Sequence, residues 1–140
     1  MPQFIKTEDL DSSAQLTLAN MQVYYDMHDV DWVISDVRIA ISNLDNYDVV
    51  LDGEVIGAIR LAYDADCCHL RDIQIKATHQ SKGFGALVIA KVVELAKEKQ
   101  LSYIDLRVFK RSPAYRLYDR LGFVVESEDD KFYHMSLAVN

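Results

Sequence analysis

A glycine-containing turn between a strand-like run and a helical run constrains this chain more than any other segment. The apolar run at residues 70–75 is followed by Gln-Ser-Lys-Gly-Phe-Gly-Ala at 80–86, and a helical pattern covers 87–99. The first turn of a helix has backbone N–H groups without intrahelical partners, and the helix dipole adds roughly half a positive charge there. Two glycines remove the Cβ atoms that would keep a phosphate away. The segment therefore predicts a backbone cradle for a pyrophosphate, with Lys82 at its rim.

Two common phosphate-binding motifs do not fit this turn. The P-loop pattern GxxxxGK[ST] is absent. The dinucleotide pattern GxGxxG fails at its third glycine, where Val88 stands, and the segment lies mid-chain instead of after a first strand. The pattern that does fit is Gln/Arg-x-x-Gly-x-Gly/Ala. A tight turn without any ligand is the simpler alternative for a loop of this composition.

Length and charge narrow the class of protein. We expect 140 residues to form a single domain, 1–140, around a sizeable core. No membrane span and no signal peptide are expected, so the predicted location is cytoplasmic. The net charge of −7 disfavours a nucleic-acid partner and slightly favours a cationic substrate such as an amine. Two adjacent cysteines, Cys67 and Cys68, are expected to be free thiols, because two cysteines alone make no zinc site.

Periodicity and turn signals predict an α+β fold. A helix is expected from the capping group at residues 11–13 to about Met27, with Leu16, Ala19 and Val23 facing inward. Asp52-Gly53 is a strong two-residue hairpin signal. The other expected helices are 32–42, 87–99 and 112–121, and the expected strands are 4–6, 47–51, 54–63, 67–76, 102–109, 123–127 and 132–139. This order indicates a mixed, mostly antiparallel central sheet flanked by helices.

A second signature lies at residues 106–123. Five residues match the pattern Asn-x-x-Ala-x-x-Leu-Tyr-x-x-x-Gly-Phe at the correct spacing, namely Ala114, Leu117, Tyr118, Gly122 and Phe123. With the glycine turn, this segment resembles motifs A and B of the Gcn5-related N-acetyltransferase (GNAT) superfamily. Arg111 stands where that family commonly has asparagine. The resemblance spans about residues 46 to 139.

The resemblance implies the GNAT fold and the transfer of an acetyl group from acetyl-CoA to a primary amine by direct attack, without a metal. The pyrophosphate is expected on the turn, and the pantetheine arm beside the preceding strand. In the family a backbone N–H of that strand, here of Ile73 or a neighbour, also polarises the thioester oxygen. The implied cofactor-binding residues are Ile73, Gln74, Ile75, Gln80, Ser81, Lys82, Gly83, Phe84, Gly85, Ala86, Arg111, Ala114 and Tyr118.

The resemblance also supplies candidates for acid and base. Tyr118 is the predicted general acid for the thiolate, since a phenol with a pKa of about 10 is protonated at neutral pH; the alternative is a core tyrosine. Tyr115 is expected to pack or to line the cofactor slot. His69 is the predicted base, through water, and Asp72 is predicted to hold the substrate ammonium or to orient water. The alternatives are a surface histidine and a salt-bridged aspartate, and some family members use no dedicated base.

Several questions stay open at the level of sequence. His28, His79 and His134 are interpreted as surface or packing residues, while Trp32 and the pair Tyr24-Tyr25 are core residues or an aromatic amine pocket. The acceptor is not identified beyond an amine-bearing small molecule or protein. The alternative function is a non-catalytic acyl-CoA-binding or regulatory module, and a third is a dinucleotide-binding fragment. A homodimer is left open as a prediction, because an exposed strand edge can pair.

Overall fold

Strand pairing sets the order of the elements in one mixed sheet. In the computed structural model, which describes residues 1–27 and 33–139, seven strands follow the order β1-β2-β3-β4-β5-β7-β6. The pairing of β4 with β5 is parallel, whereas β1 with β2, β5 with β7 and β6 with β7 are antiparallel. The strands are β1 (Gln3–Lys6), β2 (Asp45–Leu51), β3 (Glu54–Tyr63), β4 (Cys67–Ile75), β5 (Tyr103–Phe109), β6 (Val124–Glu128) and β7 (Phe132–Ala138). The predicted α+β class with a mixed sheet is confirmed.

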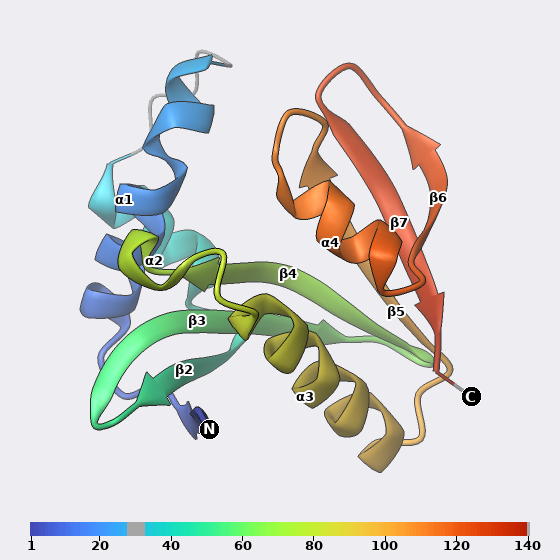
Figure 1. Cartoon of the computed structure of the whole chain (residues 1–140), viewed down its shortest axis with the longest axis horizontal. Helices are drawn as coiled ribbons and strands as arrows, with labels where there is room; N and C mark the ends of the chain where they lie inside the picture. Colours follow the sequence, from blue (N-terminus) through green and yellow to red (C-terminus); the bar gives the residue numbers. More distant parts are fainter. Residues whose placement is uncertain (28–32, 140) are drawn as a thin grey trace. The chain divides into compact units, whose positions relative to one another are not determined.

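The helices are α1 (Leu10–Met27), α2 (Ile34–Ile41), α3 (Phe84–Glu98) and α4 (Ala114–Arg120), with a short 3₁₀ turn at Ala77–His79 (Figure 1). None of the helices in the described part of the chain is both long and apolar enough to cross a membrane. The predictions for Trp32 and His28 lie outside the described residues, and nothing is described of the side chains of Tyr24 and Tyr25.

The contacts between residues group the chain into two compact units. The first unit comprises residues 1–60 and 72–84, and the second comprises residues 61–71 and 85–140. The first holds α1, α2, β1 and β2, and the second holds α3, α4 and β5 to β7. That the whole chain forms a single domain stays a prediction.

Helix α1 buries a face that its apolar spacing predicts only in part: Leu18, which also belongs to the apolar stripe, packs on the core. Ala14 is fully buried and packs with Val37 and Ile41 of α2, whereas Ala19 is exposed. Ser13 and Thr17 are also buried on this face. These two polar residues are inward because they bind a buried arginine of β3, a long-range contact that apolar periodicity cannot show. The N-cap of the helix is Asp9, whose carboxylate accepts hydrogen bonds from the backbone N–H and the hydroxyl of Ser12. The predicted capping group at residues 11–13 was therefore wrong.

Two turns follow their sequence signals. In the β2–β3 hairpin, Asp52 and Gly53 both have left-handed backbones, with φ of 51° and 82°, as a type I′ turn requires. In the loop before α3, Ser81 and Gly83 are left-handed as well, with φ of 62° and 86°. Helix α3 begins at Phe84, three residues earlier than predicted, so Gly85 and Ala86 belong to its first turn.

The second unit is built on β5, β7 and β6, which run side by side in the orange-to-red part of Figure 1. Alternate residues of β5 are buried, as predicted for Ile104, Leu106 and Val108. Helix α4 ends at Arg120, and Gly122 follows its C-cap with a φ of 100° and an N–H that donates to the Asp119 carbonyl. The N–H of Phe123 reaches back to the Tyr118 carbonyl, so the helix ends in a Schellman motif.

Candidate active site

The turn that precedes α3 lies at the surface. Ser81, Lys82 and Gly83 are exposed, and a Cβ added to Gly83 would find no atom within 4 Å. Glycine is favoured at position 83 by its positive φ of 86°, and not by crowding, because the space beside it is open. Gln80 is less available to a phosphate than predicted, because its Nε2 donates a hydrogen bond to the Ile75 carbonyl at 2.9 Å.

The second glycine of the turn has a packing role. A Cβ on Gly85 would lie 2.7 Å from Cδ2 of Leu117 on α4, which belongs to the same unit. Gly85 therefore lets α3 approach a residue of the second signature closely. Of the two glycines predicted to make room for a phosphate, only Gly83 has open space beside it.

The strand segment predicted to hold the pantetheine arm is tightly bound on one side. Gln74 is buried, and its Nε2 donates to Asp72 at 2.7 Å. A Cβ added to Gly57 of β3 would lie 2.3 Å from the backbone carbonyl oxygen of Gln74, so β3 and β4 approach closely at this glycine. The carbonyl of Ile75 accepts hydrogen bonds from the side chains of Asn20 and Gln80. The Ile75 carbonyl is therefore already hydrogen-bonded within the protein.

Asp72 is engaged in an ion pair inside the first unit. Its Oδ2 lies 2.6 Å from Nη1 of Arg60, whose side chain is fully buried. Arg60 also donates to Thr17 Oγ1, to Asn46 Oδ1 at 3.0 Å and to the carbonyl of Ser13 at 3.0 Å. This is the salt-bridged alternative that the sequence left open for Asp72. Arg60 was not predicted as part of this site, although it is the single charge in the apolar run 55–63.

His69 lies between two carboxylates and a thiol of the second unit. Its Nδ1 is 2.5 Å from Asp105 Oδ1 and 3.8 Å from Cys67 Sγ, and its Nε2 is 3.4 Å from Asp64 Oδ2. The strand register explains the first contact, because His69 of β4 lies opposite Asp105 of β5. Both ring nitrogens are therefore occupied by neighbours. The catalytic roles of His69 and Asp72 stay predictions.

Asp105 is the residue that sequence reasoning missed at this position. Its second oxygen, Oδ2, lies 3.1 Å from Nε2 of His134 on β7, so His134 has a specific partner and is not simply a surface residue. Burial favours a higher pKa for Asp105, but hydrogen bonds from His134 and His69 outweigh it and lower that pKa below its usual value. Burial, followed by the charge of Asp105, raises the pKa of Cys67 to about 11. The available signal was Asp105 itself, an acidic residue in an alternating apolar strand.

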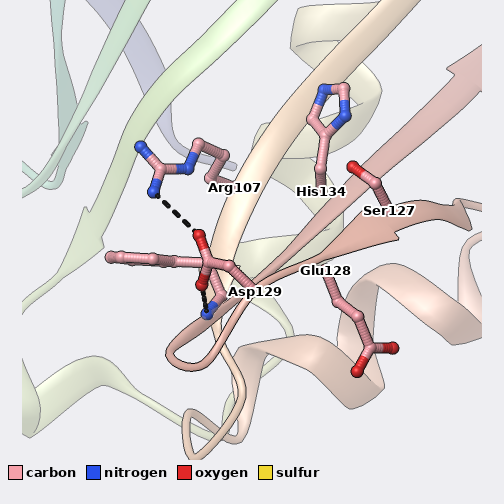
Figure 2. Close-up of a pocket in the computed structure, with 6 residues that line it drawn as sticks. Arg107, Ser127, Glu128, Asp129 and His134 are labelled. Carbon is pink, nitrogen blue, oxygen red and sulfur yellow. Dashed lines mark hydrogen bonds and ion pairs between the residues drawn. The ribbon is translucent and has the colours of Figure 1, made fainter.

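A shallow hollow adjoins His134 in the same unit. Figure 2 shows Arg107 and Asp129 facing each other there, with Nη2 and Oδ2 3.7 Å apart. The guanidinium of Arg107 also lies 4.2 Å from the centre of the Phe132 ring. Backbone N–H groups of Lys131 and Phe132 bind Asp129 and lower its pKa. The complete lining is Arg107, Ser127, Glu128, Asp129, Phe132 and His134.

Tyr118 is buried in the second unit, with 4% of its surface exposed. Its ring centre lies 5.7 Å from that of Phe123. Tyr115, one turn earlier, packs against Tyr133 of β7 at 4.8 Å, as its predicted packing role requires. Arg111 is exposed in the turn before α4. The second signature therefore supplies one buried phenol and an exposed cation.

Comparison with known proteins identifies the family. Residues 17–123, more than half of the chain, match the model of the Acetyltransferase (GNAT) family. The chain belongs to this family. The streptothricin acetyltransferase of Streptomyces lavendulae is 27% identical over 85 residues, which are 59% of this chain and 45% of that protein. The match thus spans less than half the length of that relative.

Solved structures agree on the fold. The ribosomal-protein-S18-alanine N-acetyltransferase of Escherichia coli superposes with a TM-score of 0.79 at 16% identity, covering 100% of this chain and 95% of that one. The PaiA N-acetyltransferase of Thermoplasma acidophilum, solved with coenzyme A, gives 0.75 at 20% identity over 99% of both chains. At these identities the likeness shows the fold, and the predicted GNAT fold is confirmed.

Proposed function

We propose that this GNAT family member transfers the acetyl group of acetyl-CoA to a primary amine. The observation that supports it most is the turn at residues 81–83, which is exposed, contains two left-handed residues and leads into the N-terminus of α3. Backbone N–H groups and the helix dipole favour an anion at such a position. The pyrophosphate of acetyl-CoA is the anion that the family would place there, and Lys82 adds a positive charge.

The reaction needs no covalent enzyme intermediate. The amine nitrogen attacks the thioester carbonyl carbon, a C–N bond forms, and the C–S bond breaks. The amine loses one proton, and the coenzyme A thiolate gains one. We propose that Tyr118 donates the proton that the thiolate gains, because a phenol is protonated at neutral pH and can donate to a thiolate as it forms.

An amine acceptor agrees with the relatives and with the charge of the chain. By their names, the similar proteins acetylate streptothricin or the alanine of a ribosomal protein. The net charge of −7 favours the approach of a cationic acceptor. The proposal therefore names the class, a primary amine that is cationic in solution, and no individual acceptor.

Thermal unfolding with acetyl-CoA, NAD or ATP is the direct test. A ligand at a hundred times its Kd adds roughly 2.7 kcal/mol of stability, which is a shift of several degrees for a chain of this size. A shift with acetyl-CoA alone, followed by amine-dependent thiol release, supports the proposal. A shift without thiol release from any amine would favour the non-catalytic acyl-CoA-binding module. No shift with acetyl-CoA would overturn both.

A further inference from the structure

Three different metal-binding side chains meet on β4 and β5. Cys67 Sγ, His69 Nδ1 and a carboxylate oxygen of Asp105 all lie within 4.8 Å of one another. All three residues belong to the second unit and are partly buried, and the side chains of His69 and Asp105 are 20% and 22% exposed. The cluster is therefore neither sealed from solvent nor fully exposed to it.

The donor set matches one class of ion. A thiolate, an imidazole and a carboxylate together suit Zn²⁺ and similar divalent transition metals, and do not suit Mg²⁺ or Ca²⁺, which prefer oxygen. Zn–S is about 2.3 Å and Zn–N about 2.0–2.1 Å, so sulfur and nitrogen in a tetrahedral site lie roughly 3.6 Å apart. The observed separation of Cys67 Sγ and His69 Nδ1 is 3.8 Å. The Asp105 oxygen is 2.5 Å from Nδ1 and would have to move outward by roughly 1 Å, which rotation of its side chain can provide.

The surrounding groups have the arrangement that orients metal ligands. The second nitrogen of His69 faces the Asp64 carboxylate at 3.4 Å, which is the carboxylate–histidine pairing found behind many metal-bound imidazoles. The second oxygen of Asp105 is 3.1 Å from Nε2 of His134. Two of the three candidate ligands thus have a polar partner on the side away from the shared centre.

We infer that Cys67, His69 and Asp105 form a binding site for a divalent transition metal ion of the Zn²⁺ type, with the fourth position open to water. Such an ion would link β4 to β5. Its binding does not depend on acetyl transfer. Metal binding would exclude His69 as the general base. An imidazole bound to a metal at Nδ1 and to Asp64 at Nε2 has no nitrogen left to accept a proton from an amine.

The test is a titration of the metal-free, reduced full-length protein with Co²⁺, followed by Zn²⁺. We expect one equivalent of Co²⁺ to produce a sulfur-to-cobalt charge-transfer band and the intense visible bands of tetrahedral coordination, and Zn²⁺ to abolish both. Cys67→Ser should lose the charge-transfer band. Asp64→Ala should weaken binding by roughly 10- to 100-fold, since it removes the acceptor that faces His69 Nε2.

Cys68→Ser is the matched control, because Cys68 is the adjacent thiol, is fully buried and points to the opposite face of β4. It should retain the full spectrum. Circular dichroism of each variant separates loss of a ligand from loss of the fold. Absence of a charge-transfer band in the wild-type protein, or its persistence in folded Cys67→Ser, would overturn the inference.

Discussion

Arg60 and Asp72 form an ion pair in which the arginine has no exposed surface and the two charged atoms are 2.6 Å apart. The guanidinium also holds Ser13 and Thr17 of α1 and Asn46 of β2. One side chain therefore connects the helix to three strands of the first unit. This contact gives Asp72 a structural role whether or not it also takes part in catalysis.

Removal of Asp72 should therefore destabilise the protein strongly. Asp72→Ala leaves a buried guanidinium without its counter-charge, and breaking such a pair typically costs about 3–5 kcal/mol. Urea denaturation would report the free energy of unfolding. Asp11→Ala is the matched control, because Asp11 pairs with Arg38 at an exposed position and should cost at most about 1 kcal/mol. Equal midpoints for the two variants would contradict this account.

Substitution of Gly83 should separate ligand binding from stability. Gly83 and Gly53 have nearly the same φ, 86° and 82°, and neither has an atom within 4 Å of an added Cβ. Alanine at either position should therefore impose a similar backbone strain, of order 1 kcal/mol. Only Gly83→Ala should reduce the thermal shift caused by acetyl-CoA. If Gly53→Ala reduced that shift equally, the loop at 81–83 would not be the pyrophosphate site.

Tyr118→Phe should slow acetyl transfer while it preserves the fold. The phenyl ring keeps the packing against Phe123, and the loss of a general acid typically lowers kcat by about 10²- to 10⁴-fold. Steady-state thiol release measures the effect. Tyr133→Phe, which removes a hydroxyl from another packed tyrosine of the same unit, is the control. Unchanged kcat in Tyr118→Phe would show that Tyr118 is a core tyrosine only.

Acid should weaken the cap of α1 in a way that depends on one carboxylate. Hydrogen bonds from the backbone and side chain of Ser12 lower the pKa of Asp9 below its reference value of 3.8. Because the folded-state pKa is the lower one, this stabilisation is present above about 3.8 and is lost as the pH falls through the folded-state pKa. Asp9→Asn keeps a capping oxygen without the charge.

The measurement for this prediction is the free energy of unfolding of both proteins from neutral pH to acid. The wild-type protein should lose more stability than Asp9→Asn over the acidic range. Parallel curves would mean that the ionised carboxylate contributes nothing to the helix start.

Local signals in the sequence predicted the elements well. The strand at 54–63 was predicted with its observed bounds, because Asp52-Gly53 and the turn at 64–66 define both ends locally. The predicted start of α3 is three residues late, because the sequence pattern places both glycines in the turn, whereas Gly85 lies in the helix and packs closely on Leu117. The predicted inward face of α1 was wrong at Ala19 and omitted Ser13 and Thr17, because those contacts depend on Arg60, more than forty residues away in the sequence.

The candidate site was predicted less completely, for a related reason. The glycine turn and Tyr118 lie in contiguous motifs, so the sequence alone could point to them. The contacts of His69 with Asp105, and of Asp105 with His134, depend on the registers of β4, β5 and β7, which bring together residues 36 and 29 positions apart. Alternation places a side chain on a face of a strand but does not say which residue lies opposite.

The end of α4 gives the second signature an additional meaning. The N–H of Phe123 binds the Tyr118 carbonyl, and Gly122 allows the chain to reverse there. The Gly-Phe pair thus fixes the backbone that carries the tyrosine, without any need to touch a ligand. A chain that kept Gly-Phe but replaced the tyrosine would keep this helix end, yet it would lack the proposed proton donor. Under the proposed mechanism, the residue at position 118 reports on activity, whereas the Gly-Phe pair reports on the helix end.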